Sequence, residues 1–77
     1  MISEREALAI AHEYTKGSIL KQSWNAKMGY DSKYPKSWIF SIYHRNEDND
    51  TFQTIIEVTN TGVVSDWQTK YISDEVK

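Results

Sequence analysis

The fold of this chain is decided by residues 37–59, whose sequence is SWIFSIYHRNEDNDTFQTIIEVT. Apolar side chains alternate along the first nine residues, which places Trp38, Phe40 and Ile42 on one face and Ile39, Ser41 and Tyr43 on the other. Residues 51–59 repeat the pattern, with Phe52, Thr54, Ile56 and Val58 on one side and Gln53, Ile55 and Glu57 on the other. This period of two predicts two β-strands, 37–45 and 51–59. The polar residues between them predict a solvated hairpin connection.

Two further strands are expected on either side of this hairpin. Residues 19–26 alternate in the same way, and the following segment 27–36 contains Gly29 and the only proline, so we expect a loop there. Asn60-Thr61-Gly62 predicts a tight turn into a fourth strand, 63–68. The tail 69–77 is expected to form a short helix or an irregular edge segment.

A helix is expected at the start of the chain. Ser3 and Glu6 have the spacing of a capping box, in which each side chain bonds to the backbone amide of the other. Ala7, Ile10, Ala11 and Tyr14 then form an apolar stripe with helical spacing, and Gly17 is placed to close a helix of about four turns. The elements together predict an α+β fold: one N-terminal helix packed on a three- to four-stranded antiparallel meander sheet, in a single domain over residues 1–77. The strand order stays open.

Composition narrows the function classes. The chain has 77 residues, of which 39% are hydrophobic and 13% aromatic, so it should fold around a small aromatic core. It has no cysteine, which excludes disulfides and thiolate metal sites. A net charge of −2 argues against a general nucleic-acid binder. No signal or membrane-spanning segment is recognisable, so we expect a cytoplasmic protein without a membrane partner.

Carboxylates near the central hairpin have the spacing of a calcium loop. Asn46, Asp48 and Asp50 with Glu57 match the oxygen-ligand positions, but Thr51 stands where such a loop needs glycine. The flanking segments are also strands, whereas an EF-hand needs helices. A solvated acidic turn is therefore the favoured interpretation.

Catalytic and metal motifs were sought among the remaining polar residues. His12 and His44 have no partner at zinc spacing, and both are expected to be surface or rim histidines. No nucleophile elbow, phosphate loop or closely spaced carboxylate pair is present in the sequence. We therefore predict no enzymatic activity, no cofactor and no metal site.

Two regions are candidates for contact with a partner. Segment 27–36 interleaves lysines with aromatic residues, which is typical of a base-stacking or acidic-partner site, although packing of Tyr30 and Tyr34 on the sheet edge is favoured. The second region is the face of the sheet that one helix cannot cover. It should expose Ile39, Tyr43, Ile55 and either Val63 with Trp67 or Val64. A solvated sheet face is normally polar, so we expect a homodimer, a partner or the tail 71–76 to cover this set.

Three stretches resemble known small bacterial domains. Residues 2–11 look like the opening helix of PepSY-like domains and of the immunity protein 35 family, and residues 37–42 are similar to the strand with a tryptophan and aromatic residues of that immunity family. Residues 56–64 look like the closing hairpin of both groups. The chain departs from the immunity family in its polar segment 46–50, which lacks the glycine and proline that often precede the last hairpin there.

The resemblance implies a protein that binds another protein. A member of the immunity family would bind and neutralise a cognate toxin, and a PepSY-like module would act as a structural or chaperone-like unit through self-association. Neither group implies a catalytic motif. We expect the partner-binding residues to be Ile39, Tyr43, Ile55 and Trp67 on the sheet, with Glu47, Asp48 and Asp50 in the acidic turn.

Overall fold

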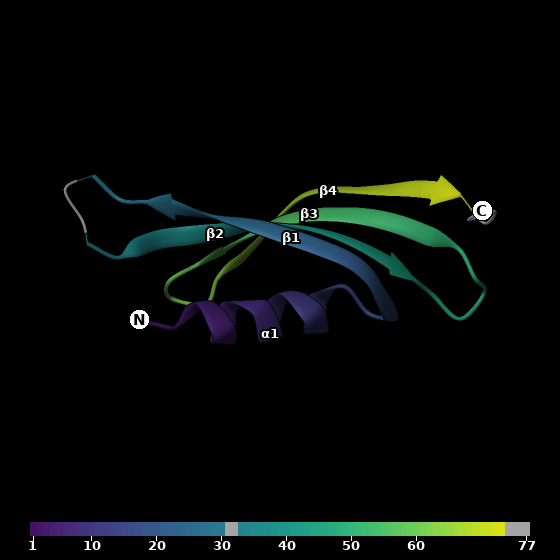
Figure 1. Cartoon of the computed structure of the whole chain (residues 1–77), viewed down its shortest axis with the longest axis horizontal. Coiled ribbons are helices and arrows are strands. Elements are labelled where there is room, and N and C mark those ends of the chain that lie inside the picture. Colours follow the sequence, from purple (N-terminus) through teal and green to yellow (C-terminus); the bar gives the residue numbers. More distant parts are fainter. Residues whose placement is uncertain (31–32, 74–77) are drawn as a thin grey trace.

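A computed structural model describes residues 1–30 and 33–73 and shows one helix lying against one face of a sheet (Figure 1). The elements follow the chain in the order α1 (Glu4–Tyr14), β1 (Ser18–Met28), β2 (Pro35–Arg45), β3 (Thr51–Thr59) and β4 (Val64–Ser73). The four strands are antiparallel and lie in the order β1-β2-β3-β4, so each pairs with its neighbour in sequence. The predicted α+β fold is confirmed, and the open strand order is that of a simple meander.

Helix α1 starts as the sequence predicts and ends earlier. The Ser3 amide donates to Glu6 Oε1 at 2.8 Å and the Glu6 amide donates to Ser3 Oγ at 3.1 Å, which completes the capping box. The helix has 11 residues, about three turns, and is capped by Thr15, whose amide and hydroxyl both donate to the carbonyl of Ala11. The expected fourth turn is wrong because Thr15 closes the helix before Gly17 is reached.

The core lies between α1 and the two central strands. Ala7 and Ala11 have no exposed surface, so the helix backbone approaches the sheet closely, as the small side chains predict. The buried side chains of the sheet are those that the alternation placed on one face: Trp38, Phe40, Ile42, Ile56 and Val58. Tyr14, by contrast, is 43% exposed at the end of the helix. Both central strands therefore turn one set of side chains to the helix.

Hydrogen bonds between side chains hold the helix layer over the sheet. The indole N–H of Trp24 on β1 donates to Glu4 at 2.8 Å, and His12 contacts Gln22 on the same strand. On the other side, the Tyr14 hydroxyl donates to the carboxylate of Asp66 on β4. The helix is thus fastened to both edge strands, and it packs on the two strands between them.

Gly17 lets the chain pass from the helix back to the sheet. Its φ is +97°, a left-handed conformation, and a Cβ at this position would lie 2.3 Å from the carbonyl oxygen of Arg45 on β2. A side chain would therefore clash with the backbone of the neighbouring strand. The glycine is needed for this crossing, not for the helix cap.

Several strand boundaries differ from the sequence predictions. The loop expected over 27–36 is shorter, because β1 continues to Met28 and β2 begins at Pro35; residues 31–32 lie outside the described residues. The expected irregular tail is also wrong in its first part, since residues 69–73 extend β4. Residues 74–77 lie outside the described residues. Pairing with the regular strand β3 keeps these polar residues extended although their own alternation is weak.

The regular alternation expected over residues 19–26 is also wrong near the start of β1. Ile19 pairs with His44 and Lys21 pairs with Tyr43, so Leu20 is the extra residue of a β-bulge. The bulge moves Ile19 to the helix side, where it is partly buried against the core, and leaves Leu20 44% exposed.

Candidate functional site

The side of the sheet away from α1, called the outer face from here on, is defined by strand register. Directly paired residues of antiparallel strands point to the same side. One row across the sheet is Lys21, Tyr43, Gln53 and Lys70. The next row is Ser23, Ser41, Ile55 and Gln68, and the row after it is Asn25, Ile39, Glu57 and Ser65. The helix contacts none of these rows, because they alternate with the buried residues of the core.

The centre of the outer face holds the apolar residues predicted from the sequence. Ile39, Tyr43 and Ile55 are each half-buried. Ile55 lies opposite Ser41, so it is the diagonal neighbour of both Ile39 and Tyr43. Diagonal neighbours on a sheet are about 7–8 Å apart, within reach of large side chains. The structure thus brings these three residues together in one patch, and the edge strands contribute polar residues around it.

Trp67 lies at the margin of this patch. Ile55 pairs with Gln68 and Ile56 pairs with Asp66, so Trp67 is the extra residue of a bulge in the edge strand β4. It is 53% exposed. The alternative choice of Val64 for the outer face is wrong, because Val64 pairs with Val58 and packs against the core.

The tail does not cover the patch over its described part. Tyr71 lies opposite Phe52, whose side chain is on the helix side of β3. The two rings make an edge-to-face contact with centroids 5.6 Å apart. The tail had been one of three expected covers; its remaining residues, 74–77, are outside the described part of the chain.

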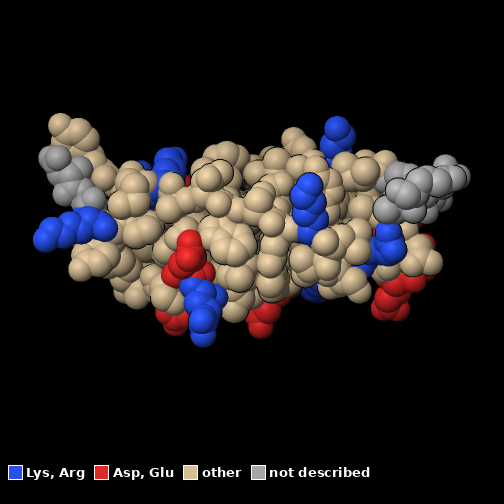
Figure 2. Space-filling model, in the orientation of Figure 1, with Lys and Arg blue, Asp and Glu red and all other residues tan. Residues whose placement is uncertain are grey.

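Cations surround the apolar centre. Lys21 and Lys70 end the row that contains Tyr43, and both are exposed. Lys27 pairs with Ser37, and Arg45 pairs with Thr51, to whose hydroxyl its Nε donates at 3.5 Å. Figure 2 shows Lys and Arg side chains at several places on this view, including the upper edge and the centre, whereas the Asp and Glu side chains lie mainly in its lower half.

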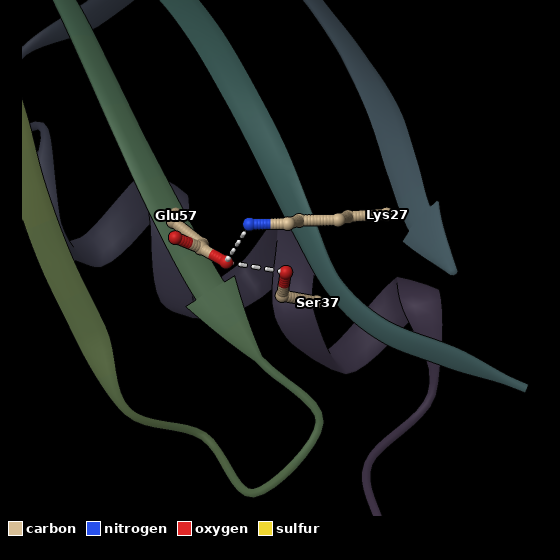
Figure 3. A network of polar contacts seen from close by, with 3 residues as sticks. All are labelled: Lys27, Ser37 and Glu57. Carbon is tan, nitrogen blue, oxygen red and sulfur yellow. Dashed lines mark hydrogen bonds and ion pairs between the residues drawn. The ribbon is translucent and has the colours of Figure 1, made fainter. Parts of the chain in front are cut away.

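One carboxylate of the outer face is held by its neighbours. Glu57 accepts a hydrogen bond from the Ser37 hydroxyl, and the Lys27 ammonium lies 3.9 Å from the same carboxylate oxygen. Figure 3 shows the three side chains meeting in front of the strands, with the helix behind the sheet. Ser37 is fully buried and the Glu57 side chain is 17% exposed. Sequence reasoning missed this network; the pairing of Lys27 with Ser37 identifies it only once the register is known.

The acidic turn lies at the end of the sheet, next to the strand end that carries Tyr43. Asn46 shapes it: its side-chain oxygen accepts hydrogen bonds at 2.9 Å from the amides of Asp48 and Asp50. Glu47 and Asp48 are exposed, and Asp50 is half-buried. These two hydrogen bonds to the Asn46 oxygen hold the backbone of the turn. Within residues 1–30 and 33–73, no cluster of three or more His, Asp or Glu side chains is arranged to hold a metal.

His44 differs from the expected rim histidine. It is 9% exposed, and its Nδ1 lies 3.1 Å from the carbonyl oxygen of Lys16. Its Nε2 lies 2.8 Å from the hydroxyl of Thr54. A carbonyl oxygen only accepts, so Nδ1 donates to Lys16, and Nε2 is within hydrogen-bond distance of the Thr54 hydroxyl, which in turn donates to the Thr69 hydroxyl. His44 is thus a buried link between the end of the helix and the central strands.

The Tyr14 hydroxyl, at the end of α1, is made less acidic by a neighbouring carboxylate. Its hydrogen bond to the Asp66 carboxylate raises the pKa of Tyr14 above its usual value, and desolvation and the negative charge of Asp66 act in the same direction. Tyr14 is exposed, so this bond fastens the helix to β4 without forming an enclosed reaction site.

No enclosed site is found elsewhere in the described part of the chain. No ligand-sized pocket is present in these residues. Their single helix is too short and too polar to cross a membrane. Comparison with family models, with curated proteins and with solved structures gives no match.

Proposed function

We propose that this chain is a small, non-catalytic protein-binding module and that its partner covers the outer face. The observation that carries the proposal is the grouping of Ile39, Tyr43 and Ile55 in the middle of a sheet face that none of the described elements covers. Sheet faces that meet only water are mostly polar, and grouped apolar residues on a surface usually mark an interaction site. Trp67 at the margin extends the set that a partner would bury.

The size of the face suits a partner of ordinary dimensions. The molecule measures 45 × 17 × 17 Å, so the sheet offers a long, narrow surface. A standard protein–protein interface covers roughly 800 Å² on each partner, about what one broad side of such a molecule provides. Tyr and Trp are also enriched among the residues that carry binding energy.

A toxin domain is the partner that we propose first. The basis is the resemblance of residues 2–11, 37–42 and 56–64 to the immunity protein 35 family, together with the acidic turn beside the patch. In this proposal Glu47, Asp48 and Asp50 contact basic residues at one end of the partner. A cytoplasmic location, expected from the sequence, stays a prediction.

Self-association in the manner of a PepSY-like module is the second candidate. The apolar patch alone would suit it, because burial of Ile39, Tyr43 and Ile55 against the same patch of a second copy removes them from water. Sedimentation equilibrium of the purified chain separates the candidates: the second requires a dimer in the absence of any other protein.

Lysine substitutions on the outer face test the proposal. Ile39→Lys and Tyr43→Lys should fold with unchanged circular dichroism and lose the partner that co-purifies stoichiometrically with the wild-type chain from its native cells. A protein encoded beside this chain is the first candidate to examine. Ala9→Lys is the matched control, because it adds the same charge at an exposed position of α1.

The opposite result would exclude this face. If both variants bind the partner as tightly as the wild-type chain and the Ala9→Lys variant, the outer face is not the binding surface and the proposed function fails.

A further inference from the structure

Most of the charges on the outer face are positive. Its described strand residues include four cationic side chains, from Lys21, Lys27, Arg45 and Lys70, and a single carboxylate, from Glu57. That carboxylate is occupied by Ser37 and Lys27. The exposed charge available to a partner is therefore positive, although the whole chain has a net charge of −2.

The helix layer carries the opposite charge. Helix α1 contains Glu4, Glu6 and Glu13 but only one strongly basic residue, Arg5. Asp66 adds a further carboxylate on the helix side of β4. The sheet thus separates an acidic layer from a cationic face, and a partner approaching the outer face meets a potential that the net charge conceals.

The cations lie beside the apolar patch. Lys21 and Lys70 are in the same row as Tyr43, one on each edge strand, so they stand on opposite sides of the ring. Interfaces are commonly built in this way, with apolar residues at the centre and charged residues on the rim that select the partner by electrostatic complementarity.

A second copy of this chain fits the face poorly. In a twofold dimer the same patch meets itself, so two sets of Lys21, Arg45 and Lys70, the cations that are not paired with Glu57, would be brought together. Like charges placed opposite each other at an interface disfavour association. The charge pattern therefore favours a different protein over self-association.

Nucleic acid also fits poorly. Binding of single strands uses aromatic platforms on which bases stack, and the centre of this face has two aliphatic residues, Ile39 and Ile55, for one aromatic ring, Tyr43.

We propose that the outer face binds an acidic protein surface, whose carboxylates meet Lys21, Lys70 and Arg45 around an apolar contact with Ile39, Tyr43 and Ile55. This inference rests on the proposed function and gives the chemistry of its partner. It also favours the first candidate, a different protein, over the second.

A titration with poly-L-glutamate tests this chemistry without knowledge of the partner. The ¹⁵N-labelled chain is followed by NMR at low salt, with poly-L-lysine as the probe of opposite charge. Poly-L-glutamate should shift the amides around Lys21, Tyr43 and Lys70, and the effect should disappear at high salt. The double variant Lys21→Glu/Lys70→Glu should bind it about tenfold more weakly or not at all.

The matched control reverses two charges on the helix side. Arg5→Glu/Lys16→Glu changes the net charge by the same amount and should retain binding within about twofold, because these side chains are far from the outer face. Equal losses in the two double variants, or no binding of poly-L-glutamate to the wild-type chain, would overturn the inference. Tighter binding of oligothymidylate at the same residues would also overturn it, in favour of nucleic acid.

Binding of the native partner to the same variants gives an independent test. One outcome is that the partner requires Ile39 and Tyr43 but binds the Lys21→Glu/Lys70→Glu variant as tightly as the wild-type chain. In that case the outer face is the docking site, but the inference that the partner surface is acidic is wrong. If the partner is insensitive to all four positions, the proposed function itself fails.

Discussion

The centres of the two sheet faces are formed by the same two strands, β2 and β3, but differ in burial. On the helix side, Phe40, Ile42 and Ile56 have no exposed surface, and Ala7 and Ala11 bring the helix close to them. On the outer side, the alternate residues Ile39, Tyr43 and Ile55 are only half-buried, and cations surround them. Alternation along a strand produces both sets, but within residues 1–30 and 33–73 only the first is covered by another element, α1. Burial thus separates residues that hold the fold from residues that we propose to bind a partner.

The largest expected effect comes from a pair of adjacent isoleucines. Ile56→Ala removes a fully buried side chain and should lower the free energy of unfolding by about 2–5 kcal/mol. Ile55→Ala, one residue away on the other face, should cost about 1 kcal/mol or less, because its side chain is already partly in water. Urea denaturation followed by circular dichroism measures both. Equal losses would mean that the two faces are equally part of the core.

A smaller effect is expected where the chain leaves the helix. Gly17→Ala should destabilise the protein by about 2 kcal/mol or more, since the left-handed conformation alone costs about 1–2 kcal/mol and the new Cβ also meets the Arg45 carbonyl. Gly62→Ala is the control: its φ is also positive, but the nearest atom to its Cβ is 3.8 Å away. Thermal unfolding should rank Gly17→Ala below Gly62→Ala. The reverse order would show that the close crossing does not fix the helix on the sheet.

The contact between His44 and Thr54 tests whether a buried polar link stabilises the junction between the helix and the central strands. Thr54→Val removes the hydroxyl that faces His44 Nε2 and leaves a buried ring nitrogen without this partner. The expected cost is about 1–2 kcal/mol. Thr69→Val serves as a comparison on the exposed edge strand: its hydroxyl makes only long contacts, 3.4 Å to Thr54 and 3.3 Å to Asp66, so a loss of a few tenths of a kcal/mol is expected. Equal costs in urea titrations would contradict the structural role given to His44.

The smallest effect on stability is expected from the hydrogen bond between Tyr14 and Asp66, and this effect depends on pH. The pKa of Tyr14 is raised in the folded chain, so the bond to Asp66 contributes stability below the ordinary tyrosine pKa near 10, and this contribution is lost as pH rises through the folded value. Asp66→Asn should bring the pKa of Tyr14 down toward its ordinary value. NMR titration of ¹³C-labelled tyrosines measures it, and an unchanged pKa in the variant would exclude Asp66 as the cause.

Much of the difference between the two sheet faces could be predicted from the sequence. The alternation in residues 37–45 and 51–59 fixed the two central strands and both faces, because one shift in register would exchange the buried and exposed sets. The capping box at Ser3 and Glu6 placed the helix start, since it depends on local bonds only. The outer-face patch followed from the same alternation.

Other features could not be predicted because they depend on pairing between distant residues. The bulges at Leu20 and Trp67 shift one edge strand against its neighbour, and no residue pattern marks them. The positive charge of the outer face appears only when Lys21 and Lys70 are placed beside Tyr43. The burial of His44 likewise requires the crossing of the chain at Gly17.

Lysine reactivity in the complex tests the central claim most directly. Amine labelling read by mass spectrometry compares the free chain with the chain bound to its native partner. We expect Lys21 and Lys70 on the outer face to lose reactivity on binding while Lys16, at the end of the helix, keeps it. Protection of Lys16 with Lys21 and Lys70 still fully reactive would contradict the claim that the uncovered sheet face is the docking surface.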